Sequence, residues 1–155
     1  MKEIFIAVLV VITSLFMSNN IVAGDPSGDA SVIYTRVLMD PEGQTYFADT
    51  EVNFELKDFA PPAGPVGVAA MQAAKTVVFT TADGDWRGNW HPAPHKQFVF
   101  MLDGAIEIEV ADGEIRQFSI GDVILLEDVS GKGHDTRVVS AEPALFAIVA
   151  LPETP

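Results

Sequence analysis

The sequence predicts an all-β protein with the architecture of a jelly roll or a small barrel. From residue 31 onward, short runs rich in β-branched and aromatic residues alternate with turn residues, and no long stretch shows helical periodicity. The run 106–110 alternates isoleucine and valine with glutamate, and Asp112-Gly113 supplies the tight turn of a hairpin. Eight or more short strands closed by such turns are typical of a jelly roll or barrel.

Nine strands are expected in order along one domain of residues 31–151, which follows a polar linker at 24–30. Segment 59–74 is too rich in proline, glycine and alanine for a central strand, because proline cannot donate to the hydrogen-bond ladder. We expect it to form a long ordered loop or an edge piece. The expected strands span residues 31–39, 46–56, 75–81, 97–102, 105–110, 114–118, 123–126, 134–139 and 144–150.

The N-terminus is predicted to be a secretory signal peptide of residues 1–23. Its apolar run, residues 4–17, is shorter than the roughly 20 residues that a membrane-spanning helix needs, and the small Ala23 suits cleavage. Lys2 is offset by Glu3, so an uncleaved N-terminal anchor is the alternative. We therefore expect a periplasmic or secreted protein that is free of the membrane after cleavage.

The charge balance argues against two classes of partner. The chain carries 22 acidic and 9 basic residues, which gives a formal net charge of −13. Such a chain is repelled by the phosphate backbone of nucleic acids and by anionic membrane surfaces, so neither is expected as a partner. The chain contains no cysteine, which excludes disulfides, thiolate metal ligands and cysteine nucleophiles.

Imidazole chemistry is confined to two short segments that hold all three histidines, His91 and His95 in one and His134 in the other. Prolines at 92 and 94 favour an extended backbone, which would place the Cα atoms of His91 and His95 about 13 Å apart. Both can then bind one metal only if the chain bends. His95 and Gln97 are two residues apart, so we expect them on the same face of a strand.

These residues resemble the two conserved motifs of the cupins. In that family the first motif reads G, five residues, H-x-H, three or four residues, E, six residues, G, and the second begins with G-D and ends in a histidine. The spacing from Gly104 places Gln97 at the usual glutamate, Ala93 at the second histidine and His91 at the first. The resemblance covers residues 75–151, and the matching positions are Gly88, His91, His95, Gln97, Gly104, Gly121, Asp122 and His134.

The resemblance implies a double-stranded β-helix with one divalent transition metal, zinc, nickel, iron or manganese, in the barrel mouth. The expected metal ligands are Gln97 and His134 with His91, His95 or both, and His95 is expected as fourth ligand or as general base. A glutamine ligand leaves the full charge on the ion, which weakens binding but strengthens polarisation of a carbonyl or a bound water. The alternatives are a turn histidine at 134 and an ordinary buried, hydrogen-bonded amide at Gln97.

Aromatic and cationic residues near the histidines are candidates for binding substrate. Trp90, together with Trp86, would wall a sugar or aromatic ligand, although core or lip packing is the commoner role. Lys132 and Arg137, and also Lys96, would hold a substrate carboxylate. The alternative for these cations is pairing with nearby acidic residues.

Three functions remain open, and the fold alone does not choose between them. The first is a metal-dependent enzyme, an isomerase or lyase, that acts on a small polar metabolite such as a sugar acid or keto acid. The second is a barrel that binds a small molecule without turning it over. The third is a structural or oligomeric module with a vestigial pocket. Cupins commonly form dimers, so the resemblance also implies a homodimer, with Phe98, Phe100 and Leu102 on the outer face.

Overall fold

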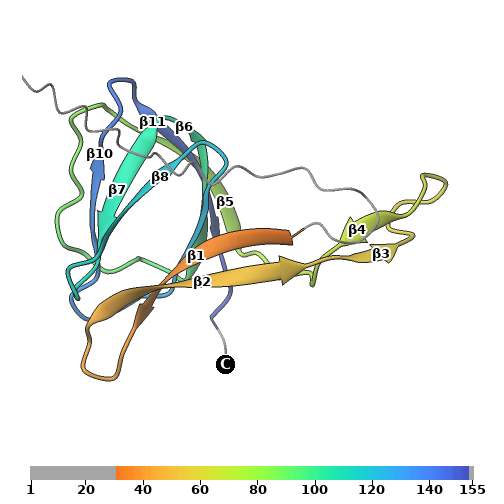
Figure 1. Cartoon of the computed structure of the whole chain (residues 1–155), viewed down its shortest axis with the longest axis horizontal. Helices are drawn as coiled ribbons and strands as arrows, with labels where there is room; N and C mark the ends of the chain where they lie inside the picture. The colour runs from red at the N-terminus through yellow and green to blue at the C-terminus, as the bar shows by residue number, and fades with distance from the viewer. Residues whose placement is uncertain (1–30, 154–155) are drawn as a thin grey trace, which may run out of the picture.

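A computed structural model describes residues 31–153, and this part of the chain is all-β (Figure 1). The predicted signal peptide and the predicted linker, residues 1–30, lie outside the described residues. Within residues 31–153 no helix is long and apolar enough to span a bilayer. The strands are β1 (Ser31–Met39), β2 (Thr45–Asn53), β3 (Glu55–Lys57), β4 (Val66–Val68), β5 (Thr76–Ala82), β6 (Gln97–Asp103), β7 (Ala105–Glu109), β8 (Ile115–Ser119), β9 (Val123–Leu126), β10 (Asp135–Val138) and β11 (Ala144–Ala150).

Two sheets form the barrel. The larger has the order β2-β1-β9-β6-β11-β5, and the smaller has the order β10-β7-β8. Strand β1 pairs in parallel with β9, and β11 lies between β6 and β5. Strands that are far apart in the sequence therefore lie side by side in the larger sheet. This arrangement confirms the predicted all-β jelly roll. The hairpin of β3 and β4 projects away from the barrel (Figure 1).

The core lies between the two sheets because alternate residues of each strand face inward. On β6 the inward residues Val99 and Met101 are buried, and on β7 the same holds for Ile106 and Ile108. Each fully buried side chain of this kind contributes about 1.5–3 kcal/mol relative to exposure. The alternation therefore fixes which side chains point into the barrel.

The outer face of the larger sheet is also apolar. Phe98 packs edge-on against Tyr34 with ring centroids 5.5 Å apart, and lies 6.0 Å from Phe100. On the edge strand β5, Val77 and Phe79 are exposed. The homodimer implied by the resemblance stays a prediction.

Most expected strands agree with the structure, and the hairpin predicted at Asp112-Gly113 is confirmed as β7–β8. Gly113 has a φ of 93°, a conformation that glycine adopts without the penalty of a side chain. The strand expected at 46–56 is divided into β2 and β3. Segment 59–74, expected as a loop or edge piece, contains the short strand β4, which tolerates the surrounding prolines because it pairs with β3 alone.

Candidate functional site

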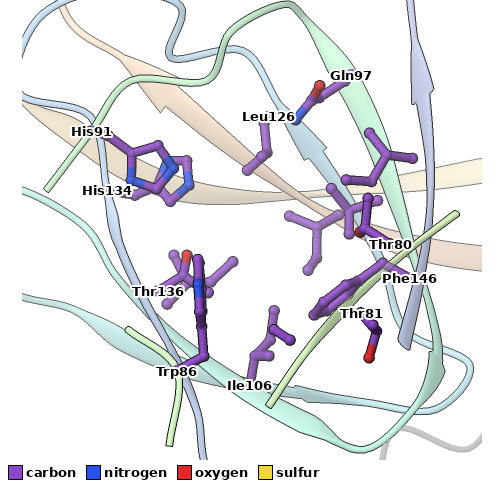
Figure 2. A pocket seen from close by; sticks show the side chains of 15 residues that line it. Thr80, Thr81, Trp86, His91, Gln97, Ile106, Leu126, His134, Thr136 and Phe146 are labelled. Atoms are coloured by element: carbon purple, nitrogen blue, oxygen red, sulfur yellow. The ribbon is translucent and has the colours of Figure 1, made fainter. Parts of the chain in front are cut away.

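A cavity of about 270 Å³ lies between the two sheets. His91 and His134 lie side by side along one side of it, Gln97 lies at its upper end, and Phe146 lies across from the histidines (Figure 2). The lining residues are Thr80, Thr81, Ala82, Trp86, His91, Gln97, Val99, Ile106, Ile108, Ile124, Leu126, His134, Thr136, Phe146 and Ile148.

The backbone brings His91 and His134 together. Each residue donates its N–H to the carbonyl of the other at 3.0 Å, which makes them a hydrogen-bonded antiparallel pair. Side chains of such a pair project from the same face, and the two rings lie with centroids 4.8 Å apart. Gly133 permits this approach, because a Cβ there would lie 2.0 Å from the His91 carbonyl oxygen.

A hydrogen bond at Nδ1 orients each imidazole. His134 Nδ1 lies 2.6 Å from Asp128 Oδ2, and His91 Nδ1 lies 2.8 Å from the Asn89 carbonyl oxygen. Both partners are acceptors, so Nδ1 of each ring carries the proton. A neutral ring then presents the lone pair of Nε2. Asn89 has a φ of 53°, a left-handed conformation that asparagine tolerates better than most residues.

Asp128 is a site residue that sequence reasoning missed. Its side chain is completely buried, and its Oδ1 atom has no hydrogen-bond partner. A buried carboxylate is costly unless it is paired, and His134 is the partner that offsets this cost. No local motif marks the pair, because it depends on the path of the loop from 128 to 134.

Trp86, which was predicted to wall a ligand, and Thr136 also line the cavity. Thr136 follows His134 by two residues and faces the same side of the chain. Gly88 N–H donates to the Thr136 carbonyl, and Val138 N–H donates to the Trp86 carbonyl. Residues 86–91 therefore extend the smaller sheet beside β10.

Gln97 faces the cavity, but His95 does not. Gln97 is the first residue of β6 and is 8% exposed, whereas His95 is exposed and is not among the lining residues. The expected shared face of His95 and Gln97 is therefore not observed. The physical reason is that residues 94–96 form a bend before β6 begins, which interrupts the strand alternation.

Of the residues expected to bind substrate, Trp86 lines the cavity. The others, Trp90, Lys132, Arg137 and Lys96, lie outside its lining. Lys132 Nζ sits 3.5 Å from the centroid of the Trp90 ring, a cation–π contact. Arg137 Nε donates to Glu107 at 2.8 Å because it points to the opposite side of β10 from Thr136. Lys96 is paired with Glu127 at 2.5 Å.

Of the expected metal ligands, the structure brings His91 and His134 together. Among residues 31–153, no group of three or more histidine, aspartate and glutamate side chains is arranged to hold one. The remaining donors are Nε2 of His91 and His134 and the amide oxygen of Gln97. Metal-binding histidines usually donate their other ring N–H to a carboxylate or a backbone carbonyl, and Asp128 and Asn89 provide these acceptors.

The fold and the site define a jelly-roll barrel in which His91 and His134 line a cavity between the two sheets. No family model matches the sequence, and no curated protein matches it either.

Several solved structures are similar in fold. An uncharacterized protein with a double-stranded β-helix domain from Klebsiella pneumoniae is 24% identical, with a TM-score of 0.39, over 49% of this chain and 65% of that one. A Cupin 2 conserved barrel domain protein from Salinispora arenicola is 19% identical, with a TM-score of 0.42, over 65% and 76%. A predicted oxalate decarboxylase from Thermotoga maritima is 16% identical, with a TM-score of 0.41, over 77% and 94%. These likenesses concern the barrel alone.

Proposed function

We propose that this chain is an exported, metal-dependent enzyme that acts on a small hydroxylated or keto compound. In this proposal His91 and His134 bind one divalent transition metal through Nε2, and the amide oxygen of Gln97 is the third donor. The observation that supports it is the hydrogen bonding of both rings at Nδ1, which leaves both Nε2 atoms as acceptors. Export rests on the predicted signal peptide at 1–23.

The charge of the site supports Lewis-acid chemistry. All three donors are neutral, so a bound ion would keep its full charge and would supply polarisation of a substrate carbonyl. Asp128 holds the His134 ring in place and increases its basicity. His95, which is exposed and outside the cavity, has no role as ligand or general base in this proposal.

Metal content of the exported protein, purified without a histidine tag, tests the proposal. We expect about one transition metal per chain, in line with one set of three protein ligands that leaves a position open for substrate. His91→Ala and His134→Ala should lose the metal, whereas the matched control His95→Ala should keep it. Turnover of keto compounds should be lost in the same two variants.

A barrel that binds a small molecule without a metal is the second candidate. It is favoured by the walls of the cavity, which are mostly apolar and have the character of an ordinary ligand pocket. Absence of metal from protein prepared with excess zinc, nickel, iron and manganese would contradict the metalloenzyme and leave this second candidate.

A further inference from the structure

We infer that the ligand has a compact oxygen head and an apolar body, and that sugars and sugar acids are not its class. The inference rests on the proposed function only for the place of the head, beside His91 and His134. The apolar body follows from the residues that line the cavity, and this part of the inference does not depend on a bound metal.

The cavity walls are predominantly apolar. Nine of the fifteen lining residues are apolar, and none is aspartate, glutamate, lysine or arginine. Ile106, Leu126 and Phe146 lie around the space that the histidines face (Figure 2). A sugar carries a hydroxyl on most carbons, and the hydroxyls that face the apolar lining residues would stay unpaired at a substantial cost.

The size of the cavity limits the ligand. A cavity of about 150 Å³ accepts benzene, which has six non-hydrogen atoms. By that scale a cavity of about 270 Å³ holds about eleven non-hydrogen atoms. The part of the ligand that lies inside the cavity is therefore about the size of a phenyl ring with a short head.

Trp86 offers a flat surface beside the proposed head position. A Cβ on Gly88 would lie 2.8 Å from Cη2 of Trp86 and 3.1 Å from Cε1 of His91, so the tryptophan and histidine rings border the same space. Because residue 88 is glycine and has no side chain, the rings of Trp86 and His91 can both lie beside it. A planar ligand body can pack on the indole while its head reaches the imidazoles.

The nearby cations do not provide a carboxylate site within the cavity. Lys132 stacks on Trp90, and Arg137 is paired with Glu107. Neither residue lines the cavity. A carboxylate would therefore enter without a side-chain counter-ion, and a bound metal would be its source of positive charge.

Calorimetric titration of the exported protein, in metal-free and zinc-loaded forms, tests the inference with three probes. Acetophenone is a neutral ketone with a phenyl body, benzoylformate is a keto acid with the same body, and glucuronate is a sugar acid. We expect acetophenone to bind both forms, and benzoylformate to bind the zinc form at least tenfold more tightly than the metal-free form. Glucuronate should bind neither.

Trp86→Ala and the matched control Trp90→Ala locate the site. Acetophenone affinity should fall at least fivefold in Trp86→Ala and stay within twofold in Trp90→Ala, which changes a tryptophan of similar exposure outside the cavity. Thermal melting shows that each variant is folded.

The inference is overturned if acetophenone fails to bind the wild-type protein, or if glucuronate binds as tightly as acetophenone. Equal loss of affinity in the two tryptophan variants also overturns it. Protein that takes up no zinc but binds acetophenone contradicts the proposed metalloenzyme and supports the inference, so the two failures are distinguishable.

Discussion

His134 and Asp128 form a buried pair in which Nδ1 lies 2.6 Å from Oδ2, with side-chain exposures of 3% and 0%. The carboxylate has no other hydrogen-bond partner for its second oxygen. The orientation of His134 in the cavity therefore depends on Asp128, although Asp128 does not line the cavity itself.

Asp128→Asn should weaken zinc binding by about 10- to 100-fold, because a neutral amide is a poorer acceptor for the proton on Nδ1. Zinc affinity is measured by competition with a chelator of known affinity. The control is Asp103→Asn. Asp103 is the exposed last residue of β6, and its replacement should leave the zinc affinity unchanged. Equal affinities of wild type and Asp128→Asn would show that the pair does not act on a metal site.

Gly133→Ala should destabilise the protein by more than about 2 kcal/mol, since its Cβ would collide with the His91 carbonyl. The free energy of unfolding is measured by urea denaturation. Gly113→Ala is the matched control, because Gly113 also has a positive φ but has open space around it, and should cost about 1–2 kcal/mol. A smaller loss for Gly133→Ala than for Gly113→Ala would contradict the close approach.

Thr45→Val should cost about 1–3 kcal/mol, because it leaves one buried and one partly buried backbone group without partners. The completely buried hydroxyl of Thr45 donates to the Gly133 carbonyl at 2.7 Å and accepts from Ala111 N–H at 2.8 Å. Urea denaturation measures the loss. Thr35→Val removes an exposed hydrogen bond to Asp49 and should change stability by less than about 0.5 kcal/mol. Similar costs for the two variants would argue against this bridge to the histidine loop.

Arg137→Gln and Lys132→Gln should leave benzoylformate affinity of the zinc-loaded protein within twofold, because both side chains are engaged outside the cavity. Loss of the partly exposed pair with Glu107 should reduce stability by about 1 kcal/mol or less. Calorimetric titration gives the affinities. A tenfold loss in either variant would restore the role in carboxylate binding that the sequence suggested.

The alternation of apolar residues predicted the strands of the barrel well, because every second residue of a strand must face the core. Val99 and Met101 alternate with Phe98 and Phe100 in the sequence and in the structure. Periodicity fails where strands end. His95 lies in a bend, so its spacing from Gln97 carried no information about the face on which it lies.

The contacts between loops also could not be predicted from the sequence. Asp128 reaches His134 because the intervening loop turns through Gly131 and Gly133, which have φ values of 72° and 75°. The pairing of His91 with His134 joins segments 43 residues apart, and neither segment alone specifies the other. Motif spacing found the residues of the site, and the loops determined which of them meet.

The pairing of β1 with β9 and of β5 with β11 determines how early during synthesis the larger sheet can form. Thr35 lies opposite Ile124, and Thr76 lies opposite Ala150, so the larger sheet stays incomplete until almost the whole chain has been synthesised. Chains dominated by such distant pairings fold slowly, in milliseconds to seconds. A nascent chain that lacks β11 therefore cannot yet join β5 to β6 and cannot close its barrel.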